Sequence, residues 1–176
     1  MITHAHYDHA GNLDLFPRSR VIMSGAEHEF WSGPMAERRQ FKHSSEDEDL
    51  AQIAAAAAEA RLVTFSGRLE LAPGVELIEV GGHTPGQSVV KVATDEGAVL
   101  LASDAIHYYE EYEDDLPFMF VADLPGMYSA FDTIHEMESS GEIQHLVSGH
   151  DPDTLNRFTP VTTGRLAGIA ATIGNK

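Results

Sequence analysis

The sequence predicts an α/β domain, because segments with helix signals and segments with strand signals alternate along the chain. Helices are predicted over residues 24–31, 45–61 and 123–139, each opened by helix-capping residues. Short apolar runs, typical of strands, occupy residues 20–23, 62–65, 69–71, 75–80, 88–94, 98–102 and 143–147. Side chains that bind metals stand where several of these strands end. The 176 residues fit a single domain spanning residues 1–176.

Two serine-initiated patterns set the helix starts in the first half. Ser24-x-x-Glu27 and Ser45-x-x-Glu48 both have the capping-box spacing. The acidic run at residues 46–49 stands at a helix N-terminus, where the helix dipole favours negative charge, so it needs no functional explanation. This helix is predicted to continue through an alanine run to residue 61. A polar loop is predicted between the two helices, over residues 34–44.

Proline and glycine mark the other boundaries. A short helix is predicted over residues 9–16, since the proline at position 17 pushes the residue before it out of the helical conformation. A turn at Asp95-Glu96-Gly97 predicts a hairpin between the flanking strands. Asp123 before Pro125 is an arrangement that opens helices well. Residues 160–172 are predicted to form a last helix that carries small residues.

The charge balance excludes some classes of partner. With 11 Lys and Arg against 28 Asp and Glu, the formal net charge is −17. Such a field repels phosphate backbones and anionic membrane surfaces, so neither a nucleic acid nor a membrane is expected as a partner. No apolar run approaches 18 residues and no signal peptide precedes the first motif, so a cytoplasmic location is expected. Cysteine is absent, so any metal must be bound by histidine and carboxylate.

The richest stretch for metal chemistry is His4-x-His6-x-Asp8-His9, with four potential ligands in six positions. A helix would point His4 and His6 about 200° apart, whereas an extended segment places both on one side. A turn near Tyr7 can then bring Asp8 and His9 back toward the same point. We therefore expect a strand end, a ligand loop and a helix that starts near His9. The alternative is a polar loop whose histidines only make hydrogen bonds, which three histidines and an aspartate at this spacing disfavour.

Three later segments place single ligands at the ends of strands. The loop Gly81-Gly82-His83-Thr84-Pro85-Gly86-Gln87 presents one histidine after a strand. Asp104 ends an apolar strand, where a buried carboxylate needs a charge partner such as a cation. His150 ends another apolar strand in Ser148-Gly149-His150.

These four motifs, in this order, resemble those of the metallo-β-lactamase superfamily. The resemblance covers residues 4–150 and implies an αββα sandwich. It implies one metal ion bound by His4, His6 and His83, a second bound by Asp8, His9 and His150, and Asp104 as a bridge between them. The family carries a further histidine where this chain has Gln87, which is not expected to bind metal. Family members also have several strands before the first motif, whereas Met1 is three residues from His4. We therefore expect part of the N-terminal half to be missing, through a fragment, a late start assignment or strands supplied by a partner.

The resemblance implies a metal-dependent hydrolase with two divalent cations. Zinc is favoured by nitrogen and carboxylate ligands, with iron, manganese and cobalt as alternatives. Two such ions lower the pKa of a shared water, and the resulting hydroxide attacks a carbonyl carbon. Asp8 and Asp104 are the predicted catalytic carboxylates, with Asp8 passing a proton to the leaving group.

The second half resembles the N-acyl homoserine lactonase-like branch, in Ser103–Glu111, Leu116-Pro117-Phe118 and Asp123-Leu124-Pro125. The predicted substrate is therefore a small-molecule lactone or carboxylic ester, with N-acyl homoserine lactones as candidates. The branch has a substrate-orienting tyrosine three residues after the bridging aspartate. Here that position is His107 and the tyrosine follows as Tyr108, so both are candidate substrate-binding residues.

Two other functions stay open. One is a glyoxalase-II-like thioester hydrolase, and the other is a non-catalytic metal-binding remnant or subunit. The chain is also compatible with a homodimer. Pocket lining and aromatic packing are both open for Tyr108, Tyr109 and Tyr112. The remaining histidines are predicted to be surface or packing residues: His28, His43, His135 and His145.

Overall fold

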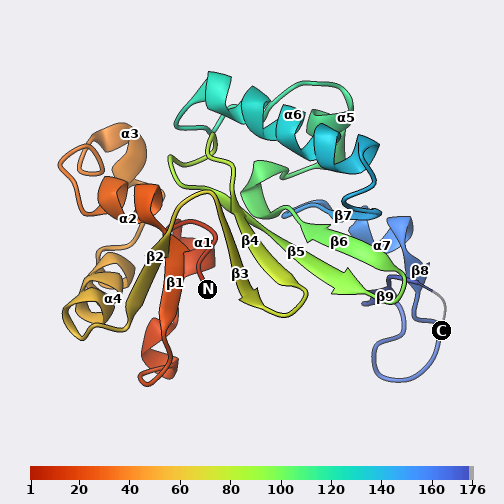
Figure 1. Ribbon diagram of the computed structural model, residues 1–176, viewed down its shortest axis with the longest axis horizontal. Coiled ribbons are helices and arrows are strands. Elements are labelled where there is room, and N and C mark those ends of the chain that lie inside the picture. Colours follow the sequence, from red (N-terminus) through yellow and green to blue (C-terminus); the bar gives the residue numbers. More distant parts are fainter. Residues whose placement is uncertain (175–176) are drawn as a thin grey trace.

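The computed structural model describes residues 1–174, which contain three sheets with helices beside them (Figure 1). A two-stranded parallel sheet pairs β1 (Val21–Ser24) with β2 (Leu62–Phe65). The main sheet has the strand order β3-β4-β5-β6-β7, antiparallel except for the parallel pair β6 and β7. Its strands are β3 (Arg68–Ala72), β4 (Val75–Glu79), β5 (Ser88–Thr94), β6 (Gly97–Leu101) and β7 (His145–Val147). A small sheet pairs β8 (Thr159–Pro160) with β9 (Ala171–Thr172).

Five of the helices lie in two groups. In Figure 1, α5 and α6 cross one side of the main sheet, while α2, α3 and α4 lie near β1 and β2. Their bounds are α1 (Tyr7–Ala10), α2 (Gly25–Trp31), α3 (Arg39–Lys42), α4 (Asp47–Ala58), α5 (Tyr109–Glu113), α6 (Leu124–Ser139) and α7 (Thr154–Arg157). Short 3-10 turns occupy Leu13–Leu15 and Ser103–Ala105. Within residues 1–174, no helix is long and apolar enough to cross a membrane.

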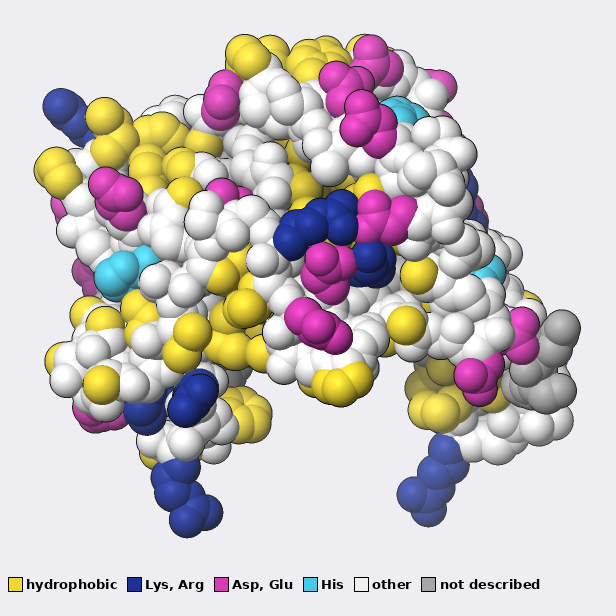
Figure 2. Space-filling model, viewed as in Figure 1, with side chains coloured by type: hydrophobic (Ala, Val, Ile, Leu, Met, Phe, Trp, Pro, Cys, Tyr) yellow, Lys and Arg dark blue, Asp and Glu magenta, His cyan; other side chains and the backbone are white. Residues whose placement is uncertain are grey.

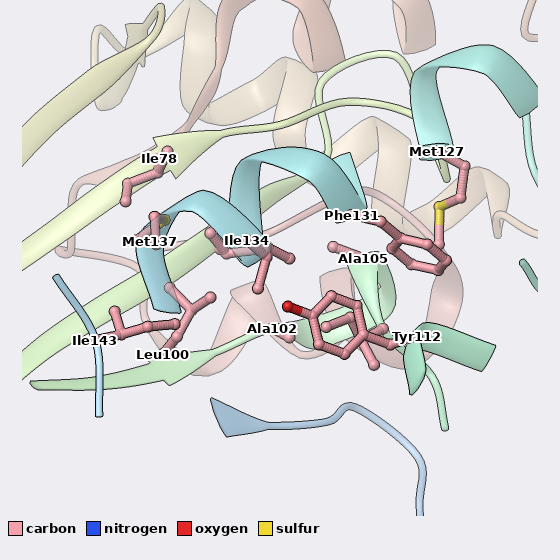
Figure 3. Packing of buried hydrophobic residues seen from close by; sticks show 12 residues of the cluster. Ile78, Leu100, Ala102, Ala105, Tyr112, Met127, Phe131, Ile134, Met137 and Ile143 are labelled. Carbon is pink, nitrogen blue, oxygen red and sulfur yellow. The ribbon is translucent and has the colours of Figure 1, made fainter. Parts of the chain in front are cut away.

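The main core lies between α6 and the sheet. Phe131 and Ile134 of α6 are almost fully buried and pack in one cluster with Leu100 of β6 and Tyr112 of α5 (Figure 3). Each fully buried side chain of this size stabilises the fold by about 1.5–3 kcal/mol. This packing fixes the ends of β6 and β7, from which Asp104 and His150 follow.

A second core supports the N-terminal ligand loop. Ile2, Met23 and Trp31 are buried in one cluster with residues of α4. The N–H of Ile2 donates to the carbonyl of Ile22 in β1, and the carbonyl of Thr3 accepts from the N–H of Ser88 in β5. The residues immediately before His4 are therefore bonded to both sheets, an anchorage that the sequence did not reveal.

The predicted strands and the helix over 123–139 are close to the observed elements, whereas both capping boxes were wrong in detail. Ser24 does cap α2, since its Oγ accepts from the N–H groups of Ala26 and Glu27. The Glu27 carboxylate, however, bonds elsewhere. Helix α4 begins at Asp47 after Glu46, so Ser45 does not cap it. The same helix ends at Ala58 rather than at residue 61, because Ala60 adopts a left-handed φ of 55°.

Three further predictions of local structure were wrong. The first helix covers only Tyr7–Ala10, because Asn12 has a φ of 66° that interrupts it before the 3-10 turn. The predicted polar loop contains α3. Residues 160–172 form a loop closed by β8 and β9 instead of a helix, and Gly164 and Gly168 take positive φ angles that a helix does not allow.

Charged side chains of both signs gather over the middle of the face in Figure 2. Among the ion pairs on the surface, Arg68 and Lys91 both contact Glu142, in the segment between α6 and β7. Glu76 contacts the same two basic side chains. This network joins β3, β4 and β5 to the segment that leads into β7.

Candidate metal centre

The four predicted ligand segments meet at one place. His4, His6, Asp8 and His9 lie on the N-terminal loop and α1, and His83 lies on the loop between β4 and β5. Asp104 lies in the 3-10 turn after β6, and His150 follows β7. Three groups whose ligand atoms lie within 4.8 Å of one another contain all seven: His4, His6, His83; His4, His9, Asp104; and Asp8, His9, His150.

The two oxygens of Asp104 face different sets of ligands. Oδ1 lies 3.1 Å from Nε2 of His9 and 3.2 Å from Nε2 of His150. Oδ2 lies 3.7 Å from Nε2 of His4 and 3.4 Å from Nε2 of His83. A carboxylate with one oxygen toward each set has the geometry of a bridge between two cations.

His6 and Asp8, which do not contact Asp104 directly, also belong to one set each. Nδ1 of His6 lies 3.0 Å from Nε2 of His83, on the Oδ2 side. Oδ2 of Asp8 lies 3.6 Å from Nε2 of His9 and 3.7 Å from Nε2 of His150, on the Oδ1 side. The Oδ2 set is buried, whereas the side chains of Asp8 and His150 are 39% and 38% exposed. Solvent therefore reaches the centre from the Oδ1 side.

The donor atoms fit divalent cations. Nε2 of His4, Nε2 of His9 and Oδ1 of Asp104 are buried, and they have no hydrogen-bond partner among the described residues. Leaving such atoms unpaired costs about 1–3 kcal/mol each, which a bound cation offsets. Donors at about 2.1 Å from a tetrahedral ion lie about 3.4 Å apart, which matches the separations around Asp104.

The electrostatics keep the ligands in metal-binding protonation states. Burial lowers the pKa of His83 to about 3 and that of His6 to about 4, so both rings are neutral with a free lone pair near neutral pH. Burial alone would raise the pKa of Asp104, but the surrounding histidines, above all His107 and His9, hold it well below its usual range. His6, His83 and Asp104 therefore need not release protons when a cation binds near neutral pH. Asp104 raises the pKa of His9 against the effect of burial, so this ring binds a proton more tightly before a cation displaces it.

Two loop glycines are required by close packing. Gly82 has a φ of 88°, and a Cβ there would lie 2.6 Å from the backbone of Met127. A Cβ on Gly86 would lie 2.2 Å from the backbone nitrogen of Glu27. These contacts press the His83 loop against α6 on one side and α2 on the other.

Glu27 connects two ligand segments and was missed as a site residue. Its fully buried carboxylate accepts from the N–H of Ala5 at 2.9 Å and from the N–H of Gly86 at 2.9 Å. It also accepts from Nε1 of Trp31 at 2.7 Å, and the Trp31 ring packs edge-on against His6. The capping-box pattern concealed this role. No local pattern indicated it, because its backbone partners lie 22 and 59 positions away in the chain.

Hydroxyl groups orient His9 from behind. Oγ1 of Thr3 lies 3.5 Å and Oγ of Ser103 3.4 Å from Nδ1 of His9, and Ser103 donates to Thr3 at 3.0 Å. Ser103 has a left-handed φ of 48°, uncommon for serine, directly before Asp104. These contacts leave Nε2 of His9 directed at Asp104.

The other predicted site residues divide between the centre and the core. His107 lies inside the centre, with Nε2 3.1 Å from Oδ2 of Asp104. Tyr108 is 43% exposed and directly follows His107, whose carbonyl accepts from the N–H of His150. Tyr109 and Tyr112 are buried, and both line a pocket that contains none of the metal-ligand residues. Gln87 is buried and donates to the carbonyl of Ser88, outside the metal-ligand groups.

Aromatic side chains surround a narrow cavity beside His6 and His83. Phe30, Trp31 and Phe120 contribute to its walls. Its volume of about 20 Å³ admits about one water molecule. Among the histidines predicted to be surface or packing residues, His43 packs on Phe120 and His135 stacks on Tyr112.

Comparison with known proteins identifies the family. The profile of the metallo-β-lactamase superfamily matches residues 1–145. The chain belongs to this superfamily. Its predicted family and fold are therefore confirmed.

Similar members of the superfamily include characterised lactonases. The chain is 32% identical over 117 residues to an N-acyl homoserine lactonase of Bacillus cereus, covering 66% of this chain and 41% of that protein. It is 30% identical over the same length to the N-acyl homoserine lactonase AiiA of Bacillus thuringiensis subsp. kurstaki. The chain thus spans about two fifths of the length of these curated relatives.

Solved structures agree on the fold. A structure of an N-acyl homoserine lactone hydrolase, with N-hexanoyl-L-homoserine at its catalytic metal centre, matches with a TM-score of 0.73 and 25% identity. The match covers 88% of this chain and 56% of that one. The dizinc quorum-quenching lactonase AidC matches with a TM-score of 0.61 and 22% identity, over 85% of this chain and 56% of that one. At that identity the second likeness concerns the fold alone.

Proposed function

We propose that this superfamily member is a hydrolase that opens lactones or carboxylic esters with two divalent cations. The observation that carries the proposal is the division of ligands around Asp104, whose two oxygens face separate donor sets. N-acyl homoserine lactones are the candidate substrate class, because the curated relatives are N-acyl homoserine lactonases.

In this proposal His4, His6 and His83 hold one cation, Asp8, His9 and His150 hold the other, and Asp104 bridges them. Zinc suits these nitrogen and carboxylate donors. Two such cations, when bound, supply Lewis acidity that polarises a carbonyl oxygen and lowers the pKa of a nearby water. The absence of cysteine leaves histidine and carboxylate as the strong ligands.

The chain's own residues direct the reaction from the Oδ1 side. The substrate enters where Asp8 and His150 are exposed, since the Oδ2 set is buried and the aromatic cavity beside it is narrow. A water oxygen bonds to the carbonyl carbon and the ring carbon–oxygen bond breaks. Asp8 carries one proton of the water to the departing alkoxide oxygen, the other proton is released to solvent, and the products are a carboxylate and an alcohol.

The test combines elemental analysis with a substrate panel for the metal-loaded full chain. We expect about two metal ions per chain and hydrolysis of N-hexanoyl homoserine lactone. Asp104→Asn should abolish turnover, while Asp95→Asn, the same change in an exposed hairpin turn, should leave it unchanged.

Two results would contradict the proposal in different ways. Hydrolysis of glutathione thioesters without any lactone or ester turnover would favour a glyoxalase-II-like thioesterase. Stoichiometric metal without hydrolysis of any substrate would favour a non-catalytic metal-binding protein.

A further inference from the structure

We propose that His107 is an additional metal ligand, whose Nε2 binds the cation on the Oδ2 side of Asp104. Glu111 is the positioning residue that holds the His107 ring. The inference rests on the two-metal site proposed above and adds to it a residue outside the four ligand motifs.

The position of His107 is equivalent to that of the motif ligands. Its Nε2 lies 3.1 Å from Oδ2 of Asp104, compared with 3.4 Å for His83 and 3.7 Å for His4. The ring centroids of His83 and His107 are 4.7 Å apart, and ligand atoms of His83, Asp104 and His107 form a group within 4.8 Å. A cation bound by His83 and Oδ2 of Asp104 is therefore within reach of His107.

Glu111 fixes the ring from the opposite side. Its Oε1 lies 3.3 Å from Nδ1 of His107, an ion-pair contact without hydrogen-bond geometry, and both side chains are buried. The same carboxylate accepts from the backbone N–H groups of His107, Tyr108 and Phe118, so it cannot easily turn away. When a cation displaces the proton of Nε2, the carboxylate beside Nδ1 favours the remaining ring proton on Nδ1, an arrangement common for metal-bound histidines.

Access to the ring argues against contact with substrate as its main role. His107 is 5% exposed, and the ring of Phe118 lies 4.5 Å from it between centroids. The exposed groups at the centre are Asp8 and His150 on the Oδ1 side. His107 thus faces the ligands. In this proposal the two cation sites differ, because four histidines and Oδ2 of Asp104 surround the cation on the Oδ2 side, whereas the cation on the Oδ1 side has one side open to solvent.

Whether His107 binds the cation can be measured with cobalt in the full chain. Paramagnetic Co²⁺ shifts the ring N–H proton of each bound histidine far outside the normal proton NMR range. Buried rings exchange these protons slowly. His4, His6 and His83 are buried, and Nδ1 of His9 is covered by the hydroxyls of Thr3 and Ser103. These four histidines should give four persistent shifted signals, and His107 should give a fifth.

Variants identify the fifth signal. His107→Gln should remove that one signal and weaken binding of one of the two Co²⁺ ions by at least about tenfold. Glu111→Gln should weaken the same ion and broaden or shift the same signal. His145→Gln is the matched control, because the His145 ring lies outside the centre, against the carbonyl of Glu96 and the ring of Phe158. Circular dichroism of the metal-free variants checks their fold.

The outcomes separate the two proposals. Four persistent signals in the wild-type chain with two bound Co²⁺ ions would overturn the role of His107 and leave the two-metal site intact, even if His107→Gln did not fold. The same holds if His107→Gln matches His145→Gln in signals and affinity. A wild-type chain that binds no Co²⁺ would overturn the two-metal site itself.

Discussion

Replacing Glu27 by glutamine tests whether the spacing of the ligand loops limits metal binding. The carboxylate accepts from the backbone beside His4 and His6, from the backbone of the His83 loop and from Trp31. A glutamine of the same shape keeps one oxygen. Its amide group, however, presents N–H donors to at least one backbone or indole N–H donor, and two donors cannot bond to each other.

The magnitude follows from two opposing contributions. One hydrogen bond to a charged group is lost, worth about 1.5–3 kcal/mol, and unpaired buried donors cost about 1–3 kcal/mol more. Burial raises the pKa of Glu27, so the charged form is itself unfavourable in this place and its removal offsets part of the loss. We expect the free energy of unfolding of the metal-free protein to fall by about 2 kcal/mol. Metal affinity should fall by about 10–100-fold, as for other residues that orient ligands.

Urea unfolding of the metal-free chain and a chelator competition for Zn²⁺ measure the two effects. Glu29→Gln is the control, because Glu29 is exposed on the same helix and the substitution changes the charge equally. If Glu27→Gln bound Zn²⁺ as tightly as Glu29→Gln, the carboxylate would not set the distance between the two ligand loops. A loss of stability without a loss of affinity would have the same meaning.

Three other predictions concern the scaffold. Phe131→Ala should lower the free energy of unfolding by about 3–5 kcal/mol in urea titrations, because it empties the core under α6. Two basic neighbours lower the pKa of Glu142 from 4.5 to about 2, so the stabilisation is present above pH 4.5 and lost as the pH falls toward 2. Glu142→Gln should therefore remove about 1 kcal/mol at pH 7 and nothing at pH 2, unlike the exposed control Glu136→Gln, and added salt should reduce the difference. Ser24→Ala should cost about 1 kcal/mol through loss of the α2 cap, measured as a lower thermal midpoint.

Local patterns predicted the fold well where backbone chemistry decides it. The Asp95–Gly97 turn fixed the hairpin of β5 and β6, and Pro125 fixed the start of α6. Prediction failed where distant contacts or unusual backbone angles decide the structure. The segment 160–172 has a composition that a helix tolerates, yet Thr159–Pro160 pairs with Ala171–Thr172 across it.

The candidate centre shows the same division. The sequence pattern predicted the residue types of the ligands and their positions at strand ends, and the structure brings all seven predicted ligands together. The groups behind them depend on which backbone N–H groups the fold leaves without partners. Glu27 could not be distinguished from a capping residue, since its bonds reach Ala5 and Gly86, 22 and 59 positions away.

The two buried glutamates solve the same physical problem on opposite sides of the Oδ2 ligand set. Ligand loops cannot follow regular hydrogen-bond ladders, so their N–H groups need acceptors inside the protein. An ionised carboxylate is an acceptor-only side chain that can receive several N–H groups at once. Glu27 receives them from the loops of His6 and His83, and Glu111 from the segments of His107 and Phe118. Each carboxylate also fixes a ring, Trp31 beside His6 in one case and His107 itself in the other. Because buried charge is costly without such partners, we infer that metal affinity depends on these backbone bonds as well as on the ligands.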